Sequence, residues 1–298
     1  MDTPYHIPAL LNETLAGLAV RSDGTYVDLT FGGGGHSRAI LQQLGEGGRL
    51  YSFDQDLDAY HHAGEEFRGN SHWQFVHSNF RYLSNFMDYY GVTAVDGILA
   101  DLGVSFHHFD DPERGFSFRF DAPLDMRMNR RAGRTAADVV NSYSEAQLAD
   151  VLYLYGELRN ARVLARRIVQ ARSSAPILRT TQLAELLGND KHTQTVAFQA
   201  LRIEVNDELG ALREMLTSSL RLLRPGGRIA ILTYHSLEDR IVKNFLRAGN
   251  IEGVIEKDFY GNILTPFRLL EKGLTASAEE VAANPRSRSA KLRVAQKI

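Results

Sequence analysis

The first hundred residues alternate between short apolar segments and helical segments, and this alternation constrains the fold more than any other feature. Strand patterns occupy residues 26–30, 49–53, 73–76 and 95–100, while residues 37–44 and 58–67 have helical patterns. Alternating strands and helices are typical of a parallel sheet that helices cover on both faces. The sequence therefore predicts an α/β fold.

The alternation stops after Asp101. Residues 103–142 are rich in Phe, Asp, Arg and Gly without a sustained period, so we expect long functional loops there. Ser144, with Gln147 three residues later, predicts the capped start of a helix. Further helices are expected over about 160–171 and from Thr181 to a stop at Gly188.

A long helix and a buried strand are expected to resume the sheet. Apolar residues recur at steps of three and four, which predicts one continuous helical face from 198 to 223. The face comprises Phe198, Leu201, Val205, Leu209, Leu212, Leu216, Leu220 and Leu223. The Pro-Gly-Gly at 225–227 would end this helix before a strand at 228–233. We therefore expect a sheet domain over 1–108 and 193–298, interrupted by a loop-rich and helical insertion over 109–192.

Carboxylates end three of the predicted strands, at Asp28, Asp54 and Asp101. Ligands of open parallel sheets bind at these strand ends, and the glycines at 32–35 would let a ligand approach the backbone. Asp54 has the spacing of an acid that binds a ribose diol. The loop alone leaves three alternatives open: S-adenosylmethionine, a dinucleotide, or merely a tight turn. The dinucleotide pattern lacks its third glycine, because Ser37 or Arg38 stands there.

Charge is unevenly distributed along the chain. The net charge is −2, yet residues 110–180 hold 12 Arg against 9 Asp and Glu, and 284–298 hold five basic and no acidic side chains. Arginine suits phosphate contacts, although a solvated surface would explain the same pattern. The phenylalanines interleaved with these arginines favour an RNA face over solvation alone, although at least half of them would serve a small core beneath the loops.

Targeting signals are missing from the sequence. No apolar run approaches the roughly 18 residues of a membrane span, and neither a secretion signal nor a transit peptide is recognisable. We therefore expect a cytoplasmic protein without membrane contact.

From His6 onward the chain resembles one family almost end to end, the RsmH/MraW family of bacterial 16S ribosomal RNA cytosine-N4 methyltransferases. The matching motifs are His6-x-Pro8-Ala-Leu-Leu-x-Glu13, Asp28-x-Thr30-Phe-Gly-x-Gly-Gly-His36-Ser37, Asp101-Leu-Gly-Val-Ser105, Arg114-Gly-Phe-Ser-Phe118, Asp121-x-Pro-Leu-Asp-Met-Arg-Met128, Tyr155-Gly-Glu157, Phe198-Gln-Ala-Leu-Arg-Ile-x-Val-Asn206, His235-Ser-Leu-Glu-Asp-Arg240 and Asn284-Pro-Arg-Ser-Arg-Ser-Ala-x-Leu-Arg293. The resemblance implies a Rossmann-like class I methyltransferase sheet with an inserted helical domain for RNA recognition. It also implies S-adenosyl-L-methionine as cofactor and the N4 amine of cytidine 1402, in the decoding centre of 16S rRNA, as substrate.

The resemblance also implies a set of cofactor contacts. Gly34, Gly35 and His36 would line the methionine and sulfonium region. Asp54 would bind the ribose, and Phe80 and Asp101 would lie on the adenine side. A glutamine of the family falls on His108 here, and imidazole can also donate or accept a hydrogen bond. From the sequence pattern alone, Phe80 is equally well explained as a core residue.

Two residues are candidates for catalysis, Ser105 and His235. Cytosine N4 is a poor nucleophile, and an acceptor for its amino hydrogens would localise its lone pair on nitrogen. Ser105 or loop carbonyls could accept these hydrogens, and His235 could hold the base or take a proton. Alternatively, His235 and Ser236 cap the next helix with Asp239. The chain has no cysteine, which excludes the thiolate adduct of cytosine-C5 methylation, and no metal site is expected.

Two other classes of function compete with the RNA methyltransferase. One is a ribosome-assembly factor without catalysis, suggested by the altered residues 106–108. The other is a dinucleotide oxidoreductase, suggested only by the glycine loop and Asp54. Neither the oligomeric state, for which a homodimer is one alternative, nor the choice between free RNA and the assembled small subunit follows from the sequence.

Overall fold

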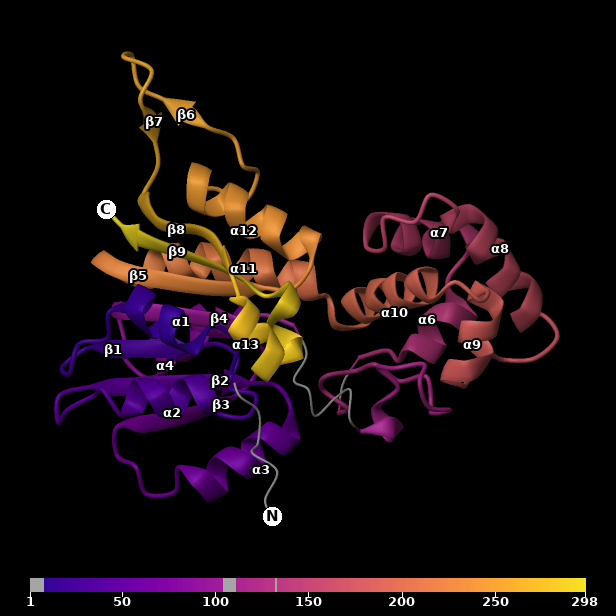
Figure 1. Cartoon of the computed structure of the whole chain (residues 1–298), viewed down its shortest axis with the longest axis horizontal. Helices are drawn as coiled ribbons and strands as arrows, with labels where there is room; N and C mark the ends of the chain where they lie inside the picture. Colours follow the sequence, from indigo (N-terminus) through magenta and orange to yellow (C-terminus); the bar gives the residue numbers. More distant parts are fainter. Residues whose placement is uncertain (1–7, 104–110, 132) are drawn as a thin grey trace. The chain divides into compact units, whose positions relative to one another are not determined.

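A computed structural model describes residues 8–103, 111–131 and 133–298 of the chain (Figure 1). It divides into two compact units. The first unit combines residues 1–103 with 209–298, and the second unit spans 104–208. The second boundary lies at 208/209 and not at the expected 192/193, because the helix over 191–206 packs into the core of the second unit. The expected boundary at 108/109 lies outside the described residues.

A mixed seven-stranded sheet forms the centre of the first unit. Its order is β3 (Trp73–His77), β2 (Arg49–Asp54), β1 (Thr25–Asp28), β4 (Val95–Asp101), β5 (Leu223–Thr233), β9 (Lys291–Lys297) and β8 (Phe267–Thr275). The first five strands in this order are parallel, as predicted. β9 is antiparallel to both of its neighbours, which makes the sheet mixed and gives it the Rossmann-like methyltransferase arrangement.

Helices cover both faces of this sheet. The elements are α1 (Leu11–Leu18), α2 (Gly35–Leu41), α3 (Leu57–Glu66), η1 (Phe80–Tyr82), α4 (Leu83–Tyr89), α11 (Glu208–Leu222), α12 (Ser236–Ala248), α13 (Ala278–Ala283) and η3 (Pro285–Ser289). Alternate strand residues enter different cores, since successive side chains of a strand point to opposite faces. Ile98 packs in the core that includes α4, α11 and α12, whereas Leu99 packs in the core that includes α1 and α2.

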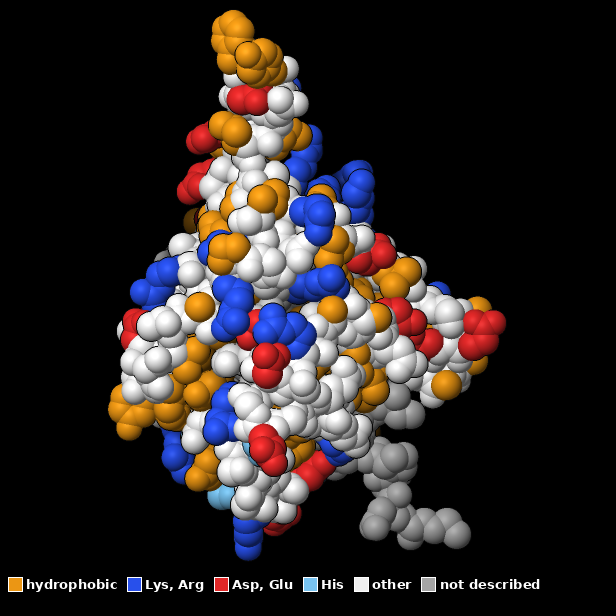
Figure 2. Space-filling view, turned by 90° about the vertical axis from the view of Figure 1, so that its left-hand side faces the viewer, with side chains coloured by type: hydrophobic (Ala, Val, Ile, Leu, Met, Phe, Trp, Pro, Cys, Tyr) orange, Lys and Arg blue, Asp and Glu red, His pale blue; other side chains and the backbone are white. Residues whose placement is uncertain are grey.

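A two-stranded hairpin, β6 (Glu256–Lys257) with β7 (Ile263–Leu264), extends from the first unit beyond α12 (Figure 1). At its turn, Phe259 is 98% exposed and Tyr260 is 87% exposed. Figure 2 shows hydrophobic side chains at this tip and several Lys and Arg side chains on the face below it. The hairpin thus leaves aromatic surface outside the cores of its own unit.

The second unit is helical and has one core of its own. Its elements are η2 (Pro112–Arg114), α6 (Ala136–Ser142), α7 (Glu145–Leu154), α8 (Ala161–Arg172), α9 (Thr180–Leu187) and α10 (Lys191–Asn206). The helices expected at 144, 160–171 and 181–188 are confirmed, including the capping box of Ser144 and Gln147. The expectation that 103–142 holds only loops was wrong for α6, which Thr135 and Asp138 cap reciprocally.

The single helix predicted across 198–223 is two helices, and this prediction was wrong. Asp207 lies between α10 and α11 with φ 47° and ψ 46°, a left-handed conformation that ends the first helix. Phe198 and Leu201 pack in the core of the second unit, whereas Leu212 and Leu216 pack in a core of the first. One uninterrupted apolar period therefore serves two separate cores.

None of the helices in the described part of the chain combines the length and the apolar character that crossing a bilayer requires.

Candidate functional site

Three aspartates end the strands β1, β2 and β4, as the sequence predicted. Asp28, Asp54 and Asp101 are the last residues of these strands. In the register of the sheet, Asp28 lies beside Ser52 of β2 and Leu99 of β4. Asp54 lies two residues beyond Ser52, and Asp101 lies two residues beyond Leu99. Because a shift of two residues keeps the same face, the three carboxyl groups project to one side of the sheet edge.

The glycine loop between β1 and α2 is fastened to Asp54. The Gly32 amide donates a hydrogen bond to Asp54 Oδ2 (2.8 Å), and the Asp56 amide donates to Oδ1 (2.9 Å). Gly32 has φ +53°, and no heavy atom lies within 4 Å of a Cβ built there, so its backbone faces open space. Gly34 has φ +75°, and an added Cβ would lie 2.7 Å from the Phe31 ring. The loop therefore requires glycine and offers its backbone to a ligand.

Asp28 has a structural place in this site. It is fully buried, and its carboxylate accepts hydrogen bonds from the Ser37 hydroxyl (2.6 Å) and the Thr30 amide (3.1 Å). Burial raises the pKa of its carboxyl to about 6. Asp28 thus joins the end of β1 to α2 from beneath the loop, while Asp54 and Asp101 are the more accessible members of the set.

Asp101 is contacted by two other side chains of the edge. The Tyr234 hydroxyl donates to Oδ1 (2.6 Å), and Nδ1 of the buried His36 lies 3.7 Å from Oδ2. Burial raises the pKa of the Asp101 carboxyl to about 7. Burial, together with the nearby Asp101, holds the pKa of Tyr234 well above its ordinary value, so the phenol stays a donor. Tyr234 and His36 thus hold the Asp101 carboxyl in position at the end of β4.

Tyr234 and Glu238 extend this network to His235. The Tyr234 amide donates to Glu238 Oε2 (3.0 Å), and Glu238 Oε1 lies 3.1 Å from His235 Nε2. A carboxylate beside Nε2 favours the proton on that nitrogen, which leaves the lone pair on Nδ1. Neither ring nitrogen of the buried His235 forms a hydrogen bond within the described part of the chain, so Nε2 is only close to the Glu238 carboxylate, and Nδ1 has no donor beside it. It is therefore an acceptor that the described protein leaves unused.

The capping alternative for His235 does not match the contacts of α12. His235 is the N-cap residue, but its side chain forms no capping hydrogen bond. Asp239, expected to complete a capping box, instead pairs with Arg293 (2.7 Å) and Lys291 (3.3 Å) of β9. The His235 side chain therefore does not cap α12, although it lies directly after the end of β5.

Phe80 lies in η1, directly after Asn79, whose side-chain Nδ2 donates to Gln55 Oε1 (3.0 Å) beyond the end of β2. Its ring is half-buried and packs against the core formed with α4 and α11. The core interpretation thus accounts for part of this side chain. Stacking on an adenine stays a prediction.

Two of the predicted site residues, Ser105 and His108, lie outside the described residues. Conversely, Tyr234 and Glu238 belong to the network but were not predicted as site residues. For Tyr234 the available signal was its position directly after β5, next to His235. For Glu238 the signal was its spacing of three from His235, which places both on one side of the first turn of a helix.

Replacing Asp101 by asparagine is expected to stabilise the protein at pH 8 and not at pH 4. Between these values the folded protein retains a proton that the unfolded chain releases near pH 3.8, so the free energy of unfolding falls as pH rises towards 7. The full rise in the pKa of Asp101 corresponds to about 4 kcal/mol of unfolding free energy. Asparagine accepts a weaker hydrogen bond from Tyr234, which offsets part of this gain, so we expect a net stabilisation of about 2 kcal/mol at pH 8. Urea unfolding of the cofactor-free protein at both pH values measures this.

The exposed Glu65→Gln on α3 is the control, and it should show no pH-dependent gain. An equal effect of Asp101→Asn at pH 4 and pH 8 would contradict the linkage.

Comparison with known proteins identifies the family to which this chain belongs. A family model described as the MraW methylase family matches residues 3–298. Ribosomal RNA small subunit methyltransferase H of Parabacteroides distasonis is 59% identical over 100% of this chain and 99% of its own length. The Bacteroides fragilis protein of the same name is 56% identical over 99% of this chain and 98% of its own. A solved rRNA methylase from Streptococcus thermophilus aligns over 100% of this chain and 98% of its own, with 13% identity and a TM-score of 0.43, too weak a similarity to support a conclusion.

Proposed function

The chain belongs to the MraW methylase family and is an S-adenosylmethionine-dependent methyltransferase of small-subunit ribosomal RNA, and we propose that it methylates the N4 amine of cytidine 1402 in the decoding centre of 16S rRNA. The observation that carries the proposal is the polar network at the ends of β4 and β5, which offers fixed acceptors to an amine. Such a substrate places the protein in the cytoplasm, and a homodimer stays one alternative for its assembly.

The strand edge fits the cofactor at its loop. Asp54 accepts hydrogen bonds from the amides of Gly32 and Asp56, and a carboxylate at the end of β2 is also a suitable acceptor for the hydroxyls of a ribose. Gly34, Gly35 and His36 would border the methionine part, and Phe80 and Asp101 the adenine side. His108 would add a further contact. When bound, S-adenosylmethionine supplies a methyl group on a positively charged sulfur.

The remaining task of the protein is to align an amine and increase its nucleophilicity. In-line displacement depends on alignment of the reacting groups. An acceptor for an amino hydrogen opposes delocalisation of the N4 lone pair into the cytosine ring. In our proposal His235 Nδ1 serves as one such acceptor, held by Glu238, and Ser105 of the β4 loop provides another. The chain contains no cysteine, so the adduct chemistry of C5 methylation has no nucleophile here.

The function is tested with small ribosomal subunits, and in parallel with free 16S rRNA, from a strain that lacks the endogenous enzyme. After incubation with S-adenosylmethionine, the fragment containing cytidine 1402 should gain one methyl group, and the nucleoside should co-migrate with N4-methylcytidine. A transfer to another nucleotide, or to C5, would overturn the proposal.

His235→Ala is expected to slow single-turnover methyl transfer about tenfold, the value of roughly one hydrogen bond in the transition state. Cofactor affinity, measured by calorimetry, should stay within twofold of wild type. The exposed His192→Ala on α10 is the matched control and should transfer at the wild-type rate. A wild-type rate for His235→Ala would remove His235 from the mechanism.

A further inference from the structure

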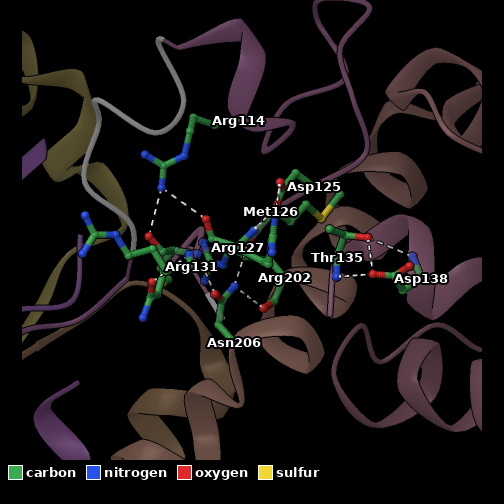
Figure 3. Close-up of polar contacts among 11 residues, drawn as sticks. Arg114, Asp125, Met126, Arg127, Arg131, Thr135, Asp138, Arg202 and Asn206 are labelled. Carbon is green, nitrogen blue, oxygen red and sulfur yellow. Dashed lines mark hydrogen bonds and ion pairs between the residues drawn. The ribbon is translucent and has the colours of Figure 1, made fainter. Parts of the chain in front are cut away.

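The segment Asp125–Met128 of the second unit is held by two polar side chains from other parts of that unit (Figure 3). Arg114, only 1% exposed, donates from Nη2 to the carbonyls of Arg127 (3.1 Å) and Met128 (3.0 Å). Asn206, the last residue of α10, donates to the Met126 carbonyl (2.8 Å) and accepts from the Met128 amide (2.8 Å). Consecutive backbone groups of the segment are thus fixed by side chains.

Met126 gives the segment a sharp turn that a side chain rarely adopts. Its φ is +63°, in the left-handed region, and its side chain is fully buried in the core of the second unit. Its amide donates to the Arg114 carbonyl (3.0 Å). A non-glycine residue in this region costs roughly 1–2 kcal/mol, so the surrounding contacts must hold the turn in place.

The fixed turn presents Arg127 in one orientation. Its Nε and Nη2 donate to the two oxygens of Asp125 (2.8 Å and 2.9 Å), and its amide donates to Oδ1 (3.0 Å). Burial opposes ionisation of Asp125, but these bonds hold the pKa of its carboxyl below the ordinary value. Nη1 of Arg127 forms no hydrogen bond within the described residues. The Nε–Nη2 edge of the guanidinium therefore binds Asp125, and Nη1 can still donate to another oxygen.

Three further arginines follow within seven positions. Arg130, Arg131 and Arg134 are exposed, and they form no ion pair in the part of the chain that the structure describes. The Arg134 guanidinium lies over the Tyr143 ring, 5.2 Å from its centroid, in a cation–π contact. An ordinary solvated turn would not need an arginine oriented by a carboxylate beside three exposed arginines.

We propose that Arg127 Nη1, together with Arg130, Arg131 and Arg134, forms a binding site for RNA phosphodiester groups, with Asp125 as the positioning residue. Arginine binds phosphate oxygens through charge-assisted hydrogen bonds, and a held guanidinium loses less side-chain entropy when it does so. The proposal rests on the RNA substrate of the proposed function and names the groups that contact its backbone.

The test measures affinity for full-length 16S rRNA as a function of salt. Arg127→Gln should weaken binding about tenfold and reduce the slope of log affinity against log salt by about one. The triple variant R130Q/R131Q/R134Q, which leaves the Arg114–Asn206 contacts intact, should reduce the slope further. Arg162→Gln, an exposed arginine on α8 with the same loss of charge, should change affinity less than twofold.

Asp125→Asn separates a positioned site from general electrostatic attraction. The substitution removes a negative charge, so an unstructured basic surface would bind RNA more tightly. If Asp125 orients Arg127, binding should instead weaken about threefold. Thermal unfolding of each variant verifies that the second unit is folded.

The inference is overturned if Arg127→Gln and the triple variant bind like Arg162→Gln, or if Asp125→Asn binds more tightly than wild type. Methylation by the wild-type protein is scored separately. Active wild type with unchanged RNA affinity in the variants would refute this site alone. Loss of RNA affinity in the variants without methylation of cytidine 1402 by wild type would refute only the proposed function.

Discussion

Asp54→Ala is expected to weaken S-adenosylmethionine binding about 100-fold. The substitution would remove two charge-assisted hydrogen bonds to the ribose, each worth about 1.5 kcal/mol at the lower end of the usual range, and about 3 kcal/mol corresponds to 100-fold. It would also release the Gly32 amide, which donates to Oδ2 at 2.8 Å, so the glycine loop would lose its attachment to β2. Isothermal titration calorimetry with the full chain measures the dissociation constant.

Asp54→Asn separates the two roles of this carboxylate. The amide keeps one acceptor for a backbone N–H but loses the charge and one acceptor oxygen, so its affinity should lie between those of wild type and Asp54→Ala. Glu65→Ala, an exposed acid on the neighbouring helix α3, is the control for net charge. A dissociation constant of Asp54→Ala within threefold of wild type would remove Asp54 from the cofactor site.

Arg114→Met is expected to lower the free energy of unfolding of the second unit by about 3–5 kcal/mol, because two buried carbonyls would lose their donor at roughly 1–3 kcal/mol each. Methionine has a similar length but leaves the carbonyls of Arg127 and Met128 without the donor that now satisfies both. The turn at Met126 would also lose part of the support that holds its left-handed backbone. Urea unfolding followed by circular dichroism reports the loss.

Arg119→Met makes the same substitution at an exposed position of the same unit and should cost less than about 0.5 kcal/mol. A loss below about 1 kcal/mol for Arg114→Met would mean that the Arg114 bonds contribute little to the stability of the segment.

Local periodicity predicted most elements of the fold, and it failed where one pattern served two structural contexts. The apolar repeat from Phe198 to Leu223 carries no proline, and its one glycine, Gly210, lies inside α11, so nothing in it indicates the end of α10. The break at Asp207 arises because the two halves pack in different cores, a tertiary effect without a local signal. By contrast, α6 did have a signal, since Thr135 and Asp138 have capping spacing, but the irregular composition around them obscured it.

The candidate site was predictable where it follows from strand topology. Asp28, Asp54 and Asp101 end strands of a parallel sheet, so their proximity follows from the direction of the chain. The contact of Tyr234 with Asp101 depends on β5 lying beside β4, and that pairing joins segments separated by the whole second unit. Similarly, no spacing rule connects Asn206 with Met126. The sequence alone therefore does not indicate that side chains support the turn at Met126. Only the folded structure, which brings Asn206 beside this turn, shows that they do.

The interruption of the first unit by the second has a consequence for synthesis of the chain. β4 ends at Asp101, and its neighbour β5 begins at Leu223, so the ribosome translates the entire second unit between them. At roughly 5–20 residues per second, this takes about ten seconds. During that interval the second unit can complete its core, while β4, with nearly all of its residues destined for burial, has one unpaired edge. The nascent chain is therefore most exposed to edge-to-edge aggregation at this stage, before β5 covers the edge.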